Sequence, residues 1–130
     1  MATAAKNSHT VLIVDDEPSI RFLCRVNLEL DGYRVLEGES IVDARTQLET
    51  ERVDVVLLDL NIGSERTDEL LEELRRRTPP IPVVLVTGSA DLGSPDRPEA
   101  DAVLAKPFAV DELTGTVRRL IALTTAERQA

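Results

Sequence analysis

Five polar side chains stand at the ends of four short apolar runs, and their types are suited to chemistry on a phosphoryl group. They are Asp15, Asp16, Asp59, Thr87 and Lys106. A short, uniformly apolar run is typical of a buried parallel strand. Parallel strands place their carboxyl ends on one edge of the sheet, where open α/β folds bind ligands. We therefore expect these side chains to lie close together at that edge.

The three carboxylates in this set predict a divalent cation. Two carboxylates a few ångströms apart repel each other by about 4 kcal/mol at an effective dielectric constant near 20. Carboxylate oxygens favour Mg²⁺, with Mn²⁺ as the alternative, and the chain has only one cysteine and one histidine with which to bind zinc. We predict Mg²⁺ as the cofactor.

A carboxylate can attack phosphorus and form an aspartyl phosphate. We predict this role for Asp59, which ends the apolar run Val55–Leu58. Lys106 would contact one phosphoryl oxygen as a point charge, and the Thr87 hydroxyl would donate to another. Simpler interpretations are a helix cap for Asp16, a turn residue for Thr87 and a structural ion pair for Lys106.

The elements that must position these residues alternate along the chain. Strands are predicted at Val11–Val14, Tyr33–Leu36, Val53–Leu58, Ile81–Val86 and Ala102–Ala105; helices are predicted at Pro18–Leu30, Ile41–Glu51 with Ser40 as cap, Thr67–Arg77 and Val110–Ala126. This alternation indicates an α/β fold, a doubly wound five-stranded parallel sheet with helices on both faces. Prolines and a glycine in Ala90–Ala100 predict that a fourth helix, between the last two strands, is short or missing.

Helical spacing predicts which side chains face the core. The first helix is expected to bury Ile20, Leu23, Cys24 and Val26, and the last helix Val110, Leu113, Val117, Leu120 and Ile121. Cys24 is then a small core residue rather than a reactive thiol. The chain is divided into a disordered tail at 1–10, one domain at 11–126 and a short tail at 127–130.

Composition limits the partners and the compartment. The formal net charge of −9 repels phosphate backbones, so no nucleic-acid partner is expected. No apolar run approaches the ~20 residues of a membrane span, so no membrane partner is expected either. The amino terminus lacks the apolar region of a signal peptide, which predicts a cytoplasmic location.

Four short motifs resemble the receiver domain of two-component response regulators over about Val11 to Leu123. They are Val-Asp-Asp-Glu-Pro, Leu-Leu-Asp, Val-Thr-Gly and Ala-Lys-Pro-Phe, in this order and each at a strand end. The resemblance implies the flavodoxin-like strand order 2-1-3-4-5, with the single-domain chemotaxis regulator as the architectural analogue.

The resemblance also implies a role for each matching residue. Asp59 corresponds to the phosphoacceptor, and the acidic pair Asp15 and Asp16 to the Mg²⁺ ligands. Asn61 corresponds to the residue whose backbone carbonyl completes the metal site. Thr87 and Lys106 correspond to the switch hydroxyl and the phosphate-contacting lysine, and Pro107 to a proline that commonly follows a cis peptide bond.

The predicted function is that of a stand-alone receiver. It takes a phosphoryl group from a histidine kinase or phosphotransfer protein and signals through contact with a downstream protein or a homodimer. Its only catalysis is its own phosphorylation and dephosphorylation, so it is not expected to be an enzyme in the usual sense. Val103 stands where the family has an aromatic switch residue. That difference motivates the alternative of a degenerate receiver that acts as a constitutive interaction or dimerisation module.

A third hypothesis is a Mg²⁺-dependent phosphatase of the haloacid-dehalogenase type. Such enzymes carry a second Asp two residues after the nucleophile, where this chain has Asn61. The resemblance to receiver domains is therefore favoured.

Overall fold

The computed structural model describes residues 9–60, 67–88 and 100–129. Five parallel strands form one sheet in the order β2-β1-β3-β4-β5, as predicted. The strands are β1 (Thr10–Val14), β2 (Arg34–Gly38), β3 (Val55–Asp59), β4 (Val83–Thr87) and β5 (Ala102–Ala105). The helices among these residues are α2 (Pro18–Leu30), α3 (Ile41–Thr50), α4 (Thr67–Arg76) and α5 (Val110–Gln129). The segment Ala90–Ala100, predicted to lack a full helix, lies outside the described residues except for Ala100.

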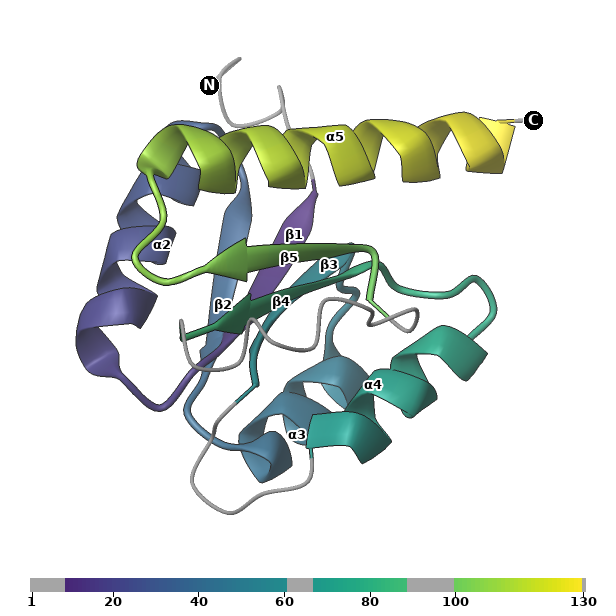
Figure 1. Cartoon of the computed structure of the whole chain (residues 1–130). Helices are drawn as coiled ribbons and strands as arrows, with labels where there is room; N and C mark the ends of the chain where they lie inside the picture. Colours follow the sequence, from purple (N-terminus) through teal and green to yellow (C-terminus); the bar gives the residue numbers. More distant parts are fainter. Residues whose placement is uncertain (1–8, 61–66, 89–99, 130) are drawn as a thin grey trace.

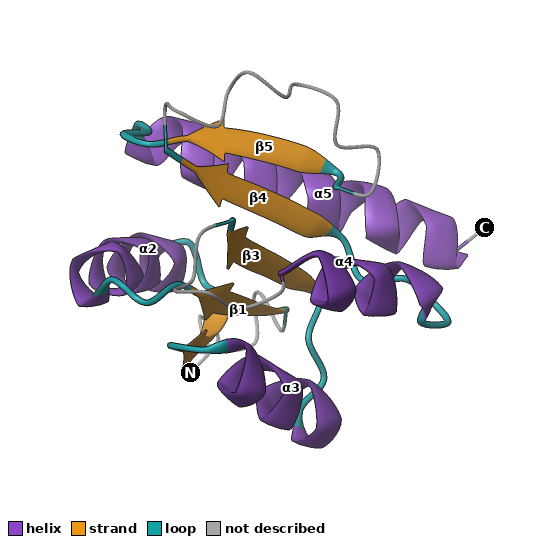
Figure 2. Ribbon diagram, turned by 60° about the horizontal axis from the view of Figure 1, so that its bottom comes forward, coloured by secondary structure: helices purple, strands orange, loops and turns teal. Residues whose placement is uncertain are grey.

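The helices cover both faces of the sheet (Figures 1 and 2). Helices α2 and α5 pack on one face and α3 and α4 on the other. In β1, alternate residues divide between the two layers: Val11 and Ile13 join the α2–α5 core, whereas Leu12 and Val14 join the α3–α4 core. Because β1, β3 and β4 are buried along their whole length, their sequences read as continuous apolar runs.

Local signals set the ends of several elements. Ser40 caps α3 by accepting a hydrogen bond from the Asp43 N–H at 3.1 Å. Gly32 follows α2 with a φ of 97°, a conformation that glycine adopts without steric cost. Strand β4 begins two residues later than predicted, because Pro82 has no N–H and the Ile81 N–H donates to the Leu74 carbonyl at 3.2 Å.

The predicted buried face of α2 is partly wrong. Leu23 and Val26 are each 37% exposed, whereas Leu28, which was not predicted, is fully buried with Cys24. Ile20, Cys24 and Leu28 are four residues apart and form the stripe that faces the sheet. Leu23 lies at the margin of that stripe and Val26 on its far side.

Helix α5 begins at Val110, as predicted, but the burial of Val110 and the C-terminal end of the helix differ from the prediction. Val110 is 38% exposed because it is the first residue of the helix, ahead of the turns that pack on the sheet. The other four residues of the predicted stripe are buried. The helix continues to Gln129, so residues 127–129 belong to α5 and not to a tail. At the other end of the chain, Thr10 is a buried residue of β1 rather than part of a disordered tail, and residues 1–8 lie outside the described part.

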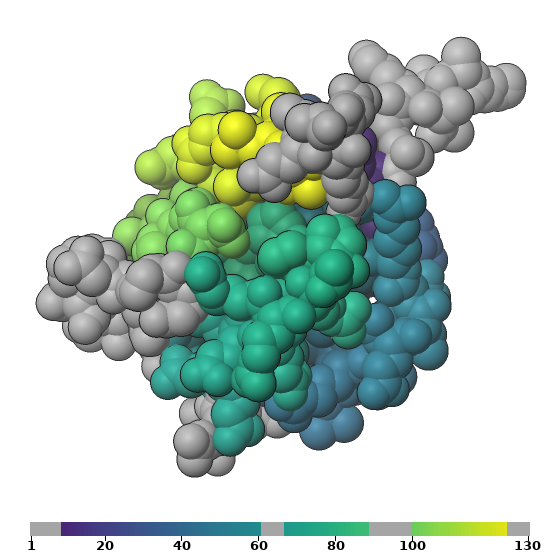
Figure 3. All heavy atoms as spheres, turned by 90° about the vertical axis from the view of Figure 1, so that its right-hand side faces the viewer, coloured from purple at the N-terminus to yellow at the C-terminus, as the bar shows by residue number. Residues whose placement is uncertain are grey.

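None of the helices in the described ranges is long and apolar enough to cross a membrane. Figure 3 shows the side of the molecule on which α4, in teal, lies below α5, in yellow. A groove of about 490 Å³ lies between Pro79 and Pro80, which follow α4, and Leu123 of α5. This groove is at the opposite end of the strands from the polar residues considered next.

Candidate functional site at the carboxyl edge of the sheet

Backbone hydrogen bonds hold the ends of the strands in register at this edge. Asp59 is the last residue of β3 and pairs with Val86, and the next N–H, that of Leu60, donates to the Val86 carbonyl at 3.0 Å. The Lys106 N–H donates to the Thr87 carbonyl at 2.7 Å. The functional side chains therefore project from backbone that is held in place by hydrogen bonds of the sheet.

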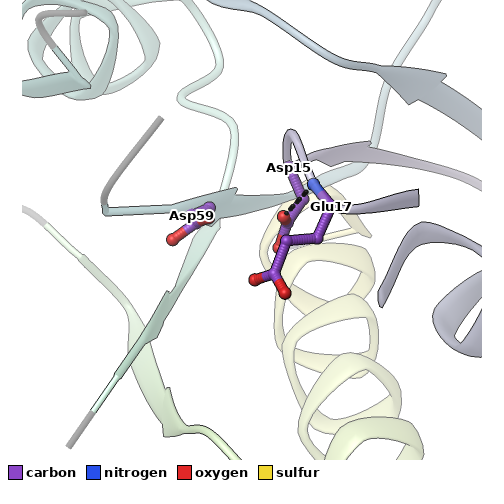
Figure 4. Close-up of side chains that lie close together, drawn as sticks. All are labelled: Asp15, Glu17 and Asp59. Atoms are coloured by element: carbon purple, nitrogen blue, oxygen red, sulfur yellow. Dashed lines mark hydrogen bonds between the residues drawn. The ribbon is translucent and has the colours of Figure 1, made fainter. Parts of the chain in front are cut away.

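Three carboxylates meet at this edge. One oxygen each from Asp15, Glu17 and Asp59 lies within 4.8 Å of the others (Figure 4). Asp15 and Asp59 are buried, whereas Glu17 is exposed. Asp16, predicted as a metal ligand, is exposed and is not part of this group. Asn61 lies outside the described residues.

Glu17 was missed by the sequence reasoning, and its position has a local cause. Its N–H donates to Asp15 Oδ1 at 2.9 Å, and its carbonyl accepts the first hydrogen bonds of α2. It is the N-cap residue, but its side chain makes no capping hydrogen bond, which leaves the carboxylate available to the site. The signal in the sequence was its place directly after the acidic pair and before Pro18.

Arg21 supports the same turn from the first part of α2. Its Nη1 donates to the Asp15 carbonyl oxygen at 2.7 Å, and its Nε donates to Glu37 Oε1 at 3.1 Å. A charged donor on a backbone carbonyl is among the stronger hydrogen bonds in proteins. Arg21 therefore fixes the end of β1 from which Asp15 projects.

The Lys106 ammonium lies among the three carboxylates. Its Nζ is 2.8 Å from Glu17 Oε1, 3.3 Å from Asp15 Oδ2 and 3.5 Å from Asp59 Oδ2. Burial by itself lowers the pKa of Lys106, but the hydrogen bond to Glu17 and the charges of Asp15 and Asp59 outweigh it and raise the pKa above its usual value. Lys106 is therefore positively charged at neutral pH.

Asp15 has a raised pKa, mainly because burial disfavours its charged form. The hydrogen bond from the Glu17 N–H opposes this shift, the charge of Asp59 adds to it, and Lys106 opposes it again. The repulsion predicted from the sequence is therefore present, and Lys106 partly offsets it.

The other predicted site residues, Thr87, Pro107 and Val103, lie on β4, after β5 and on β5. Thr87 is buried at the end of β4, and its hydroxyl donates to the Gly88 carbonyl at 3.2 Å. The Lys106–Pro107 peptide bond is cis, as is Thr78–Pro79. Val103 pairs with Leu85 in the sheet and is 43% exposed on β5.

A divalent cation of the Mg²⁺ type fits the donors that this edge offers. All three are carboxylate oxygens, with no sulfur or imidazole among them. The single positive charge of the Lys106 ammonium is shared by all three carboxylates, so it does not neutralise them fully. Asp15 and Asp59, the two buried carboxylates of this group, would hold a cation, which would neutralise charge on a phosphoryl oxygen when bound.

The fold and the site together define a class of protein: flavodoxin-like domains with an acidic cluster, a hydroxyl and a lysine at the carboxyl edge of the sheet. Within this class, the response regulator receiver domain model matches residues 11–118. The chain belongs to the response regulator receiver domain family. Receiver domains bind Mg²⁺ through an acidic cluster and interact with histidine kinases or phosphotransfer proteins.

Curated relatives agree with this assignment. The chain is 33% identical to the KDP operon transcriptional regulatory protein KdpE of Escherichia coli over 112 residues, covering 83% of this chain and 49% of that protein. It is 32% identical to the phosphate regulon transcriptional regulatory protein PhoB of Pseudomonas aeruginosa over 120 residues, covering 88% of this chain and 52% of PhoB. The chain thus spans about half the length of these two relatives.

Solved structures show the same fold. A CheY-like response regulator receiver domain protein from Methanospirillum hungatei superposes with a TM-score of 0.83 at 26% identity, covering 93% of this chain and 99% of that one. The response regulator TrrA of Thermotoga maritima, solved in complex with Mg(2+)-BeF, gives a TM-score of 0.73 at 30% identity, covering 86% of this chain and 98% of TrrA.

Proposed function

We propose that Asp59 accepts a phosphoryl group from a phosphohistidine of a histidine kinase or phosphotransfer protein, and that the phosphorylated chain signals through contact with another protein. The main support is the position of the Asp59 carboxylate, buried at the end of β3 with its Oδ2 3.5 Å from the Lys106 ammonium. A cytoplasmic location is part of this proposal.

In the transfer step an Asp59 carboxylate oxygen forms a bond to phosphorus while the phosphorus–nitrogen bond of phosphohistidine breaks. The electron pair of that bond stays on the imidazole nitrogen of the donor. Lys106 contacts a phosphoryl oxygen through its ammonium, and the Thr87 hydroxyl turns from the Gly88 carbonyl to donate to another. Hydrolysis by water releases inorganic phosphate and restores the carboxylate, which ends the signal.

Labelling of the purified chain with radioactive acetyl phosphate tests this function. We expect Mg²⁺-dependent label that is released by hydroxylamine, as an acyl phosphate is. Asp59→Asn should take up no label. Asp111→Asn is the matched control, because Asp111 is an exposed acid in the first turn of α5 and is not one of the three clustered carboxylates. Equal labelling of Asp59→Asn, or no labelling of the wild-type chain, would contradict the proposal.

A degenerate receiver that binds its partner constitutively is the second candidate. It is favoured by Val103, which leaves an exposed aliphatic side chain where the family has its aromatic switch. A pull-down with and without phosphorylation separates the two functions. If the phosphorylated and unphosphorylated chains retain the same partner equally, or form homodimers equally, the constitutive interaction module is favoured.

A further inference from the structure

The shortest contact of Lys106 among the three carboxylates is with Glu17. Its Nζ donates to Glu17 Oε1 at 2.8 Å, compared with 3.3 Å to Asp15 Oδ2 and 3.5 Å to Asp59 Oδ2. The Glu17 side chain is 55% exposed, whereas those of Asp15 and Asp59 are 3% and 5% exposed. The closest partner of the lysine is therefore the one that can turn into solvent.

The ammonium is surrounded by acceptors. Two of its three N–H groups donate to Glu17 Oε1 and Asp59 Oδ2, and Asp15 Oδ2 lies 3.3 Å from its nitrogen. A phosphoryl oxygen that binds Lys106 competes with these carboxylates. Releasing Glu17 costs least, because water can solvate an exposed carboxylate and cannot easily reach the two buried ones.

We propose that Glu17 is a positioning residue that holds Lys106 in the unphosphorylated state and competes with the phosphoryl group for it. This inference rests on the proposed phosphorylation of Asp59. The Glu17–Lys106 ion pair then stabilises the unphosphorylated form, and phosphorylation exchanges it for a contact between Lys106 and a phosphoryl oxygen. A ligand shifts such an equilibrium only by its difference in affinity for the two forms. Removing the charge of Glu17 should therefore strengthen phosphoryl binding.

Beryllofluoride, a phosphoryl mimic, tests this when its affinity is measured by ¹⁹F NMR at saturating Mg²⁺. We expect Glu17→Gln to bind it roughly two- to fivefold more tightly than wild type, the range of an exposed ion pair. Glu39→Gln is the matched control: Glu39 is an exposed acid directly after β2, and its ion pair is with Arg21 at 3.9 Å rather than with Lys106. Its affinity should stay near that of wild type.

A double-mutant cycle with Lys106→Met separates this role from a general charge effect. Lys106→Met alone should weaken beryllofluoride binding, and adding Glu17→Gln to it should then change nothing further. The carboxyl ¹³C signal of Glu17 in the wild type should also move toward that of a free glutamate when beryllofluoride binds.

Several outcomes would overturn the inference. The exchange is excluded if Glu17→Gln binds beryllofluoride no more tightly than wild type. It is also excluded if Glu17→Gln raises the affinity equally with and without Lys106, or if the ¹³C signal of Glu17 does not move when beryllofluoride binds. If wild type binds and Glu17→Gln does not differ, this inference alone fails. If wild type does not bind beryllofluoride at all, the proposed function fails and takes this inference with it.

Discussion

The Nη1 of Arg21 donates a hydrogen bond of 2.7 Å to the carbonyl oxygen of Asp15, and so joins the first turns of α2 to the end of β1. Asp15 carries one of the three clustered carboxylates, so this bond orients part of the site through the backbone. Groups that orient metal ligands typically contribute 10–100-fold to metal affinity. We therefore expect the loss of Arg21 to weaken metal binding at the site.

We expect Arg21→Ala to weaken Mg²⁺ binding by about tenfold and to lower the free energy of unfolding by about 1–3 kcal/mol, because a charged hydrogen bond to a partly buried carbonyl is lost. Calorimetric Mg²⁺ titration and urea unfolding measure the two effects. Arg25→Ala is the matched control, since Arg25 is on the same helix and pairs with Glu29 and Glu37 without contacting Asp15. Equal losses of Mg²⁺ affinity in both variants would contradict the role of Arg21.

The raised pKa of Asp15 predicts how stability depends on pH. In the folded state Asp15 holds its proton at pH values where the unfolded chain, with a pKa near 3.8, has lost it. The native state then binds more protons, so the Asp15 contribution to the free energy of unfolding falls as the pH rises above the unfolded value. We expect the stability difference between wild type and Asp15→Asn to fall in this window when EDTA is present.

Urea unfolding of wild type and Asp15→Asn between pH 3 and 7 measures that difference. The contributions of the other carboxylates to the free energy of unfolding cancel, because both chains carry them. Mg²⁺ should oppose the trend, because a cation binds the ionised form. A difference that rises with pH in EDTA would show that the hydrogen bond and Lys106 outweigh burial at Asp15.

Cys24 should be chemically inert in the folded protein. Burial, with a further contribution from the charge of Asp15, raises the pKa of its thiol to about 12, although Lys106 opposes the shift. At pH 8 only about one thiol in ten thousand is then the reactive thiolate. We expect iodoacetamide to modify Cys24 only as fast as the chain unfolds. A Leu30→Cys, Cys24→Ser variant is the control, because Leu30 is 80% exposed on the same helix and should react promptly.

The sequence was sufficient to predict the central strands, because β1, β3 and β4 are buried on both faces and read as continuous apolar runs. The order of the five strands in the sheet was predicted from the resemblance to receiver domains and is confirmed. The positions of Asp59 and Thr87 at strand ends followed directly from those runs. The role of Glu17 did not, because it depends on how the turn after β1 directs one exposed side chain toward Lys106, 89 residues away. Long-range side-chain contacts of this kind leave no periodic signal.

The α2 face was mispredicted for a different reason: the helix is apolar on more than one side. Phe22, Leu23, Val26 and Leu30 are all exposed to some degree, beside the buried Cys24 and Leu28. Periodicity distinguishes two faces only when one of them is polar. Packing against β1 and α5 decides which apolar stripe is buried.

A pair of substitutions on α2 tests which stripe the fold uses. We expect Leu28→Ala to lower the free energy of unfolding by about 2–5 kcal/mol, because Leu28 is fully buried and its removal leaves a cavity in the α2–α5 core. Leu30→Ala, two residues further along and 80% exposed, should change it by less than about 0.5 kcal/mol. Urea unfolding followed by circular dichroism measures both. Equal losses would mean that Leu30 is buried in solution, by a second copy of the chain or by another part of it, and a dilution series would show which.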